Sequence, residues 1–110
     1  MIRDHVNGVV QYHFEGLDGV ENLRHAVLTR LGGVSEGPYA TLNLGHTVGD
    51  DPDAVEENHR RALMPLGIHP DQVVSPWQVH GARVEIVGKE HLGTVRPETD
   101  ALLTHAPGVP

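Results

Sequence analysis

The pattern of apolar and polar residues along this chain predicts several short strands and one helix. Apolar-rich runs bounded by turn residues predict strands at residues 9–14, 23–29, 82–87 and 99–104, with a shorter one beginning at 73–74. Within residues 82–87, Ala82, Val84 and Ile86 alternate with Arg83 and Glu85. Because alternate side chains of a strand point to opposite faces, the three apolar residues are expected to form a buried face. Residues 88–98 are predicted to be a polar connection.

One helix is predicted from residue 52 to about residue 64. Asp51 is a capping residue and Pro52 suits the first turn, while Pro65 cannot donate the backbone hydrogen bond that a continuing helix needs. The acidic residues around this start are explained by capping and by the helix dipole, and not by a metal site. Apolar residues at helical spacing define one face of the helix: Val55, Ala62, Leu63 and Leu66.

The loop at residues 29–44 is the first candidate for function. It holds three glycines and a proline within seven residues, which indicates turns and is expected to expose backbone N–H groups. Arg30 adds a positive charge and a planar set of donors, a combination that suits an anionic or hydroxylated ligand. Leu42 and Leu44 are expected to share one face, so that Asn43 points the other way, toward the ligand of the loop. A structural turn without a ligand is the competing interpretation.

Composition and charge narrow the class of protein. The chain has 110 residues, enough for one domain with a modest core, and only 4% of them are aromatic. Its net charge is −7 and no basic cluster offsets it, which argues against nucleic acid and anionic membranes as partners. No signal peptide or membrane-length apolar run is visible, so a soluble, cytoplasmic protein is expected. The chain has no cysteine, so no thiolate chemistry is available within it.

The second candidate for function is the stretch Gln78-Val79-His80-Gly81. His80 lies where the chain enters a predicted strand, next to a glycine that lets other groups approach closely. The nine histidines of the chain raise the question of zinc, which needs at least three protein ligands in suitable geometry. No two histidines are spaced three or four apart on the predicted helix. The residues alone therefore predict a small acidic α/β-type domain with one loop of interest.

Two groups of motifs, in this order, resemble the laccase-domain family, also described as multicopper polyphenol oxidase-like or YfiH/YlmD. The first group is the sequence of residues 29–39, continued by residues 42–45 and 48–52, and the second is Gln78-Val79-His80-Gly81, followed by residues 100–104. The resemblance covers nearly all of the chain from about Val20 onward. It implies an α/β (α+β) fold, a layered sandwich with mixed β-sheets.

The resemblance also implies an activity, that of zinc-dependent purine nucleoside phosphorylases, which act on inosine, adenosine and methylthioadenosine and deaminate adenosine. Purine nucleosides and phosphate would then be the ligands. His80 matches the first zinc ligand of the family and would be both metal-binding and catalytic. Arg30 and Asn43 are hypothesised to bind substrate, Arg30 at phosphate or ribose and Asn43 at ribose or base.

The sequence departs from the family in length. The family's other metal ligands, a cysteine in an Ala-Asp-Cys segment and a histidine in a His-Ala-Gly-Trp-Arg-Gly segment, have no counterpart here. Residues 1–110 are therefore expected to be the N-terminal part of a single truncated domain that alone binds zinc weakly and is inactive. His59 also stands where the family usually has arginine.

Two other interpretations remain open. The chain could be a non-enzymatic binding module, or one subunit of a split enzyme whose missing C-terminal portion arrives as a second polypeptide. Phenol oxidation by copper, suggested by the older family name, is the weaker expectation, because such sites need many histidines and a cysteine in set arrangements.

Overall fold

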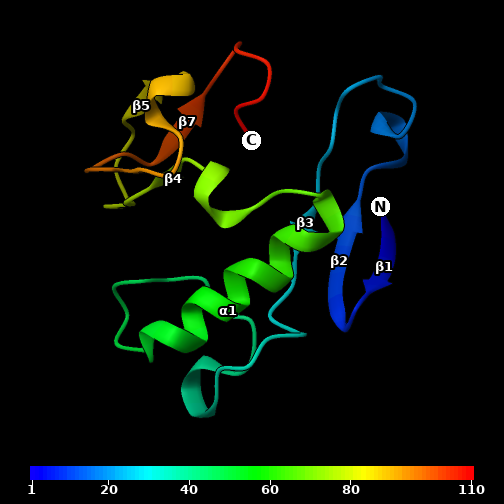
Figure 1. Ribbon diagram of the computed structural model, residues 1–110, viewed down its shortest axis with the longest axis vertical. Coiled ribbons are helices and arrows are strands. Elements are labelled where there is room, and N and C mark those ends of the chain that lie inside the picture. The colour runs from blue at the N-terminus through cyan, green and yellow to red at the C-terminus, as the bar shows by residue number, and fades with distance from the viewer. The chain divides into compact units, whose positions relative to one another are not determined.

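The computed structural model describes all 110 residues, which form two compact units, Met1–Gly67 and Ile68–Pro110 (Figure 1). The first unit contains an antiparallel sheet and the only α-helix, and the second contains two short parallel sheets. The fold is therefore α+β with mixed strand directions, as the sequence predicts. No helix has both the length and the apolar character needed to cross a membrane.

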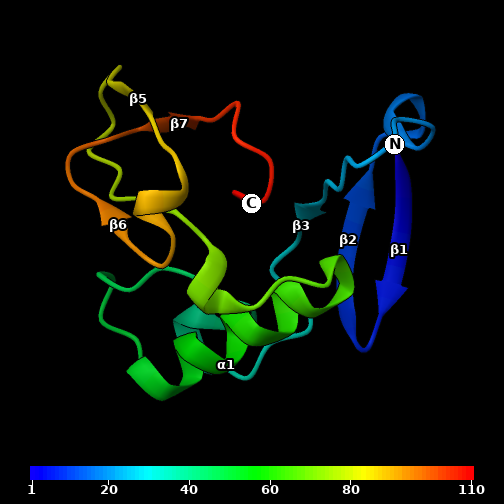
Figure 2. The same cartoon turned by 45° about the horizontal axis from the view of Figure 1, so that its top comes forward.

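The sheet of the first unit has the order β1-β2-β3 (Figure 2). Strands β1 (Ile2–Val6) and β2 (Val9–His13) form a hairpin, and β3 (Val27–Leu28) pairs with the other edge of β2. Asn7 and Gly8 form the turn with φ of 50° and 85°, the left-handed angles that a two-residue hairpin loop requires. The predicted strand at 9–14 is confirmed, the one at 23–29 is confined to two residues, and β1 was not predicted.

Helix α1 (Pro52–Leu63) begins and ends where the sequence indicates. The Asp51 side chain caps it by accepting a hydrogen bond of 3.0 Å from the backbone N–H of Asp53. Pro65 then falls in a single 3-10 turn, Met64–Leu66, which Gly67 ends with a φ of 69°. The predicted capping and the predicted effect of Pro65 are both confirmed.

The core of the first unit joins the hairpin, the glycine-rich loop and the helix. Val9, Leu42 and Ala62 are buried together, and Leu28 and Leu44 pack against them. Leu42 and Leu44 therefore face the same core, as their spacing predicts. This packing fixes the loop at 29–44 between a strand and a helix.

The second unit pairs its strands in parallel. Strand β4 (Ser75–Pro76) pairs with β6 (Val95–Arg96), and β5 (Val84–Ile86) pairs with β7 (Ala101–Leu103). The strand expected from residue 73 thus begins two residues later, and the predicted connection at 88–98 contains β6. The buried side chains of this unit are Val74, Val87 and Thr99.

The predicted buried face of β5 is wrong. Val84 and Ile86 are 53% and 69% exposed, whereas the Glu85 side chain is only 17% exposed. Glu85 points inward because Arg96 donates to its Oε1 from Nε and Nη2, at 2.9 and 2.8 Å, and Thr99 lies 3.2 Å from its Oε2. The bond from Arg96 is the main reason why the pKa of Glu85 is lowered. A paired and hydrogen-bonded carboxylate can occupy an interior position that an unpaired one cannot.

Candidate functional site

The loop at residues 29–44 folds back on itself through Thr41. The Thr41 hydroxyl oxygen accepts the backbone N–H groups of Gly32 and Gly33 at 3.1 and 3.2 Å. A Cβ on Gly33 would overlap the Thr41 carbonyl oxygen and the Asn58 side chain. Glycine is therefore required at position 33 by the closeness of the surrounding backbone.

Asn58, on helix α1, connects the helix to this loop. It is fully buried, with 0% of its surface exposed. Its Oδ1 accepts the N–H of Val34 at 2.8 Å, and its Nδ2 donates to Ser35 Oγ and to the Asn43 carbonyl oxygen, both at 2.8 Å. Every polar atom of this buried amide is thus engaged, as burial demands.

Asp50 completes the network on the other side of Ser35. Its Oδ2 accepts the Ser35 hydroxyl at 2.5 Å and Asn43 Nδ2 at 3.1 Å, and its Oδ1 accepts the backbone N–H of Asp51 at 2.8 Å. The bond from Ser35, followed by that from Asn43, holds the pKa of Asp50 below its usual range. Ser35, Asn43, Asp50 and Asn58 are called the loop network below.

This geometry corrects one expectation about the loop. Its backbone N–H groups from residue 31 to residue 35 are not free, because Thr29, Thr41 and Asn58 accept all five of them. The loop therefore offers no set of open amides at these residues. Any contact with an anion at this point has to come from side chains.

Arg30 is the side chain in the loop that is placed to make such a contact. It is exposed, its Nε donates to the Ala40 carbonyl oxygen at 3.1 Å, and it forms no ion pair. That one bond fixes the base of the guanidinium group while its Nη atoms stay open. Fixed charge with open planar donors suits a phosphate or carboxylate.

Asn43, the other predicted substrate-binding residue of this loop, is largely committed to the protein. Its Oδ1 accepts the N–H of Gly45 at 3.1 Å, and its Nδ2 donates to Asp50 at 3.1 Å. Its remaining bond, from Nδ2 to the Gly45 carbonyl oxygen, is long at 3.5 Å. Only this last N–H could turn to a ligand without opening the loop network.

His80, the predicted metal ligand, belongs to the second unit and is exposed. Its backbone adopts a φ of 57°, in the left-handed region that non-glycine residues rarely occupy. The residue before it, Val79, donates its N–H to Asp100 Oδ1 at 3.1 Å. His80 is therefore presented on a sharp turn that Asp100 holds from the side.

The second oxygen of Asp100 has no partner. Asp100 Oδ2 is buried and makes no hydrogen bond, and a Cβ on Gly81 would lie only 3.1 Å from it. The unpartnered oxygen thus lies against Gly81, the residue after His80. No three His, Cys, Asp or Glu side chains of the chain come close enough together to hold a metal ion. A complete zinc site would need ligands beyond these residues.

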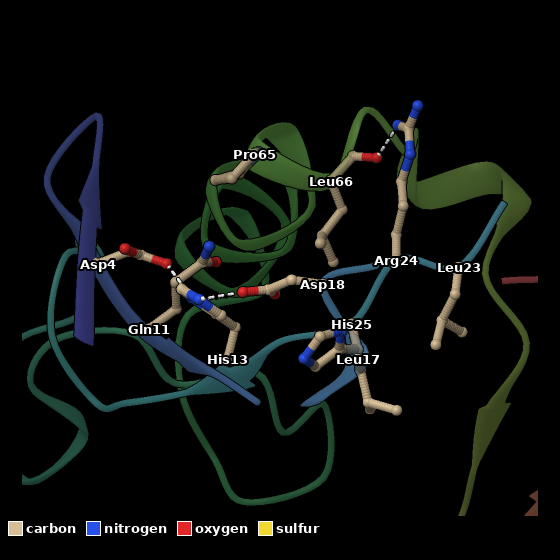
Figure 3. Close-up of a pocket in the computed structure, with 10 residues that line it drawn as sticks. All are labelled: Asp4, Gln11, His13, Leu17, Asp18, Leu23, Arg24, His25, Pro65 and Leu66. Atoms are coloured by element: carbon tan, nitrogen blue, oxygen red, sulfur yellow. Dashed lines mark hydrogen bonds and ion pairs between the residues drawn. The ribbon is translucent and has the colours of Figure 1, made fainter. Parts of the chain in front are cut away.

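Another group of side chains lines a pocket of about 350 Å³ in the first unit (Figure 3). His13 lies between two carboxylates, with Nδ1 at 2.5 Å from Asp4 Oδ2 and Nε2 at 3.2 Å from Asp18 Oδ2. The bond to Asp4 is the main cause of the raised pKa of His13. None of Arg30, Asn43 and His80 lines this cavity.

Sequence reasoning missed Asn58, Asp50 and Asp100. Asn58 had a signal, since an amide three residues after Val55 and four before Ala62 interrupts the apolar face of the helix. Asp50 was assigned to the acidic start of the helix. Its spacing from the neighbouring acidic residues does not reveal that it also bonds to the loop. Asp100 gave no signal, because its contact with Val79 spans 21 residues.

Comparison with known proteins places these residues in a family. Residues 24–110, which include Arg30, Asn43 and His80, match the model of the multi-copper polyphenol oxidoreductase laccase family. A purine nucleoside phosphorylase of Corynebacterium glutamicum is 42% identical over 88 residues, or 79% of this chain and 36% of the relative. One from Mycobacterium tuberculosis is 45% identical over 85 residues, or 77% of this chain and 34% of the relative.

Solved structures agree on the fold. YlmD from Geobacillus stearothermophilus is 34% identical with a TM-score of 0.76, over 96% of this chain and 41% of that one. YfiH from Bacillus licheniformis, at 22% identity, has a TM-score of 0.80 over 94% of this chain and 40% of that one, and is similar in fold. The chain spans about a third of the length of the curated relatives named above. By the match over residues 24–110, the chain belongs to the multi-copper polyphenol oxidoreductase laccase family.

Proposed function

We propose that this chain supplies the N-terminal part of a zinc-dependent purine nucleoside phosphorylase. The substrates would be inosine, adenosine and methylthioadenosine, cleaved with phosphate, and adenosine would also be deaminated. The observation that carries the proposal is the identity of 42% and 45% to proteins named purine nucleoside phosphorylase, over most of this chain.

Three residues would carry the function of this part. His80 would be one zinc ligand, and its exposed position on a turn leaves the imidazole accessible. A zinc ion at such a site can polarise a leaving purine or activate water. Arg30 would bind phosphate through its open guanidinium nitrogens. Asn43 would contact ribose or base through the N–H that makes only a long bond to Gly45.

The remaining zinc ligands, a cysteine and a second histidine, would come from a further portion of polypeptide. An apolar face of the second unit supports the proposal that a further portion of polypeptide covers it. Val84 and Ile86 on β5 and Leu103 on β7 are 53%, 69% and 60% exposed. Parallel strands are ordinarily covered on both faces, so this face is expected to be covered in the working protein.

The same face supports a second candidate, in which the chain is one subunit of a split enzyme. The two candidates differ only in whether the covering portion is covalently attached. Sequencing the messenger RNA downstream of codon 110 separates them. An in-frame Ala-Asp-Cys segment indicates one long chain, and a stop codon indicates two.

The proposal is tested by mixing the 110-residue chain with a second polypeptide that carries the rest of the Corynebacterium glutamicum relative. The chain alone is expected to bind zinc weakly and to leave inosine intact. The mixture is expected to bind zinc stoichiometrically and to release hypoxanthine only when phosphate is present. Robust turnover by the chain alone, or a stable complex without any turnover, would contradict the proposal.

A further inference from the structure

We infer that Asn7 is a site of spontaneous covalent modification, at which the side-chain amide is lost and part of the product is isoaspartate. The nucleophile is the backbone nitrogen of Gly8, so no second protein is needed. The site lies at the turn between β1 and β2 and involves none of the residues proposed to bind zinc or substrate.

The four asparagines of the chain differ in the residue that follows them. Asn7 is followed by glycine, whereas the other three, Asn22, Asn43 and Asn58, are followed by leucine or histidine. A side chain on the following residue hinders the approach of its backbone nitrogen to the asparagine side chain, and glycine has none. The sequence therefore favours this reaction at Asn7.

The turn leaves the nucleophile open. Val6 pairs with Val9, so the two residues between them form the loop of the hairpin. Both are exposed, and the Gly8 N–H makes no hydrogen bond within the protein. A Cβ built on Gly8 would meet nothing within 4 Å. The nitrogen that attacks is therefore neither bonded nor covered.

The amide that is attacked is weakly held. Asn7 Nδ2 donates to Met64 Sδ at 3.4 Å, and a thioether sulfur is a weak acceptor. The amides of Asn43 and Asn58, by contrast, belong to the loop network, and Asn58 is fully buried. Asn7 can therefore turn toward the Gly8 nitrogen without breaking a strong bond.

The reaction is an acyl transfer between neighbouring groups, which removes the entropy cost of bringing the reactants together. The Gly8 nitrogen gives its proton to water or hydroxide and forms a bond to Asn7 Cγ. The bond from Cγ to Nδ2 breaks, ammonia leaves, and a cyclic succinimide remains. Water then opens the ring at Cγ to give aspartate, or at the backbone carbonyl carbon to give isoaspartate. One water is consumed in all and one ammonia is released.

The isoaspartyl product changes the turn, because its main chain runs through Cγ and contains one more carbon. The hairpin loop depends on left-handed angles at Asn7 and Gly8, with φ of 50° and 85°. The turn also packs against the glycine-rich loop, since a Cβ on Gly32 would overlap the Gly8 carbonyl oxygen and Val9 Cα. Isoaspartate is therefore expected to loosen the contact between the hairpin and that loop.

The aspartyl product keeps the ordinary main chain. Its carboxylate replaces the amide in a pocket of about 430 Å³, which is lined by Asn7, Arg60, Arg61 and Met64. A negative charge beside two arginines is favourable, so this product is expected to retain the hairpin. The variant Asn7→Asp is therefore the reference for the isoaspartyl form.

The experiment incubates the full 110-residue chain in native buffer above neutral pH, where hydroxide assists the loss of the Gly8 proton. Mass spectrometry of peptides locates the replacement of NH₂ by OH, and an isoaspartyl methyltransferase detects isoaspartate. Asn22 is the internal control: it is also exposed, with a φ of 61°, but it precedes Leu23, whose N–H donates to the Val20 carbonyl oxygen at 3.4 Å. Conversion should be at least about 10-fold faster at Asn7, which corresponds to a barrier lower by about 1.4 kcal/mol.

The variant Leu23→Gly tests the role of the following residue and leaves the hairpin intact. It should accelerate conversion at Asn22 and leave the rate at Asn7 unchanged. Asp18 also precedes a glycine, and its isomerisation would give isoaspartate without any loss of ammonia. Only isoaspartate in the peptide that contains Asn7, together with the change of mass there, counts in favour.

Equal rates at Asn7 and Asn22 in the wild type, or conversion of Asn7 only after unfolding in urea, would overturn the assignment. The effect on the loop is measured by hydrogen exchange of the Thr29 amide, which donates to the Val10 carbonyl oxygen at 3.1 Å. Exchange should be faster in the purified isoaspartyl form than in Asn7→Asp. Equal exchange in these two forms would show that the turn does not hold the loop.

Discussion

Among single residues, the side chains that hold the loop in place differ from the side chains that we propose to contact a ligand. Asn58 and Asp50 have their hydrogen-bonding atoms directed at the protein, and they hold the glycine-rich loop in place. Arg30 and His80 direct theirs outward. Asn43 does both, because its amide supports the loop and leaves one weakly used N–H.

Replacing Arg30 by alanine should weaken phosphate binding in the complete protein. A charge-assisted hydrogen bond contributes roughly 1.5–3 kcal/mol, so the KM for phosphate should rise by about 10-fold or more. The KM for nucleoside should change little. Initial rates at varied phosphate measure this, with Arg3→Ala, an exposed arginine on β1, as the control. An unchanged phosphate KM would remove Arg30 from the site.

Replacing Asn58 by alanine should destabilise the first unit strongly. The substitution leaves the Val34 N–H and the Asn43 carbonyl oxygen without their partner, and each such buried group costs roughly 1–3 kcal/mol. A loss of about 3 kcal/mol is expected from urea unfolding. Glu56→Ala, on the exposed side of the same helix, should stay within about 0.5 kcal/mol of the wild type. Similar losses for both variants would contradict the role given to Asn58.

At the scale of elements, the sequence predicted best where a local rule sets the structure. The start of α1 follows from the capping chemistry of Asp51, and its end follows from Pro65. The inward side of β5 could not be predicted, because Glu85 turns inward to pair with Arg96, 11 residues further along the chain. The same limit applies to the candidate site, where His80 was selected from a local motif, whereas Asp100, which accepts the N–H of Val79, was not.

The β1–β2 hairpin should lose stability as the pH rises above 6.5. His13 on β2 bonds to Asp4 on β1 and to Asp18, and its folded-state pKa is raised above the ordinary value of 6.5. The contribution of the charged imidazole is therefore complete below pH 6.5 and is lost as the pH rises through the raised folded-state pKa.

This loss is measured by urea midpoints at a series of pH values. His13→Gln should flatten the dependence over that range, whereas His5→Gln, at an exposed position of β1, should retain it. Equal pH dependence in wild type and His13→Gln would show that His13 does not hold the hairpin.

At the scale of the whole chain, the two units differ in how completely they cover their apolar residues. The first unit packs the hairpin, loop and helix around Val9, Leu42 and Ala62. The second unit leaves the apolar side chains on one side of β5 and β7 exposed. On the other side, Glu85 forms an ion pair with Arg96.

The isolated chain should self-associate through that uncovered side. Replacing Ile86 and Leu103 together by threonine removes exposed apolar surface without touching the buried residues, so the self-association should weaken. Sedimentation velocity at several concentrations measures this. The paired substitution Val20→Thr and Val48→Thr, also at exposed apolar positions, is the control. An unchanged association constant in the Ile86 and Leu103 variant would show that the chain does not self-associate through this face.

We propose that His80 contributes to a nucleoside-cleaving zinc site together with ligands from outside residues 1–110. The most direct test is a chimera in which residues 24–110 replace the matching segment of the Corynebacterium glutamicum relative. The measurement is phosphate-dependent release of hypoxanthine from inosine, with and without His80→Ala. Turnover is expected in the chimera, and the variant is expected to lose both turnover and bound zinc. A folded chimera that keeps its turnover without the His80 imidazole would contradict it.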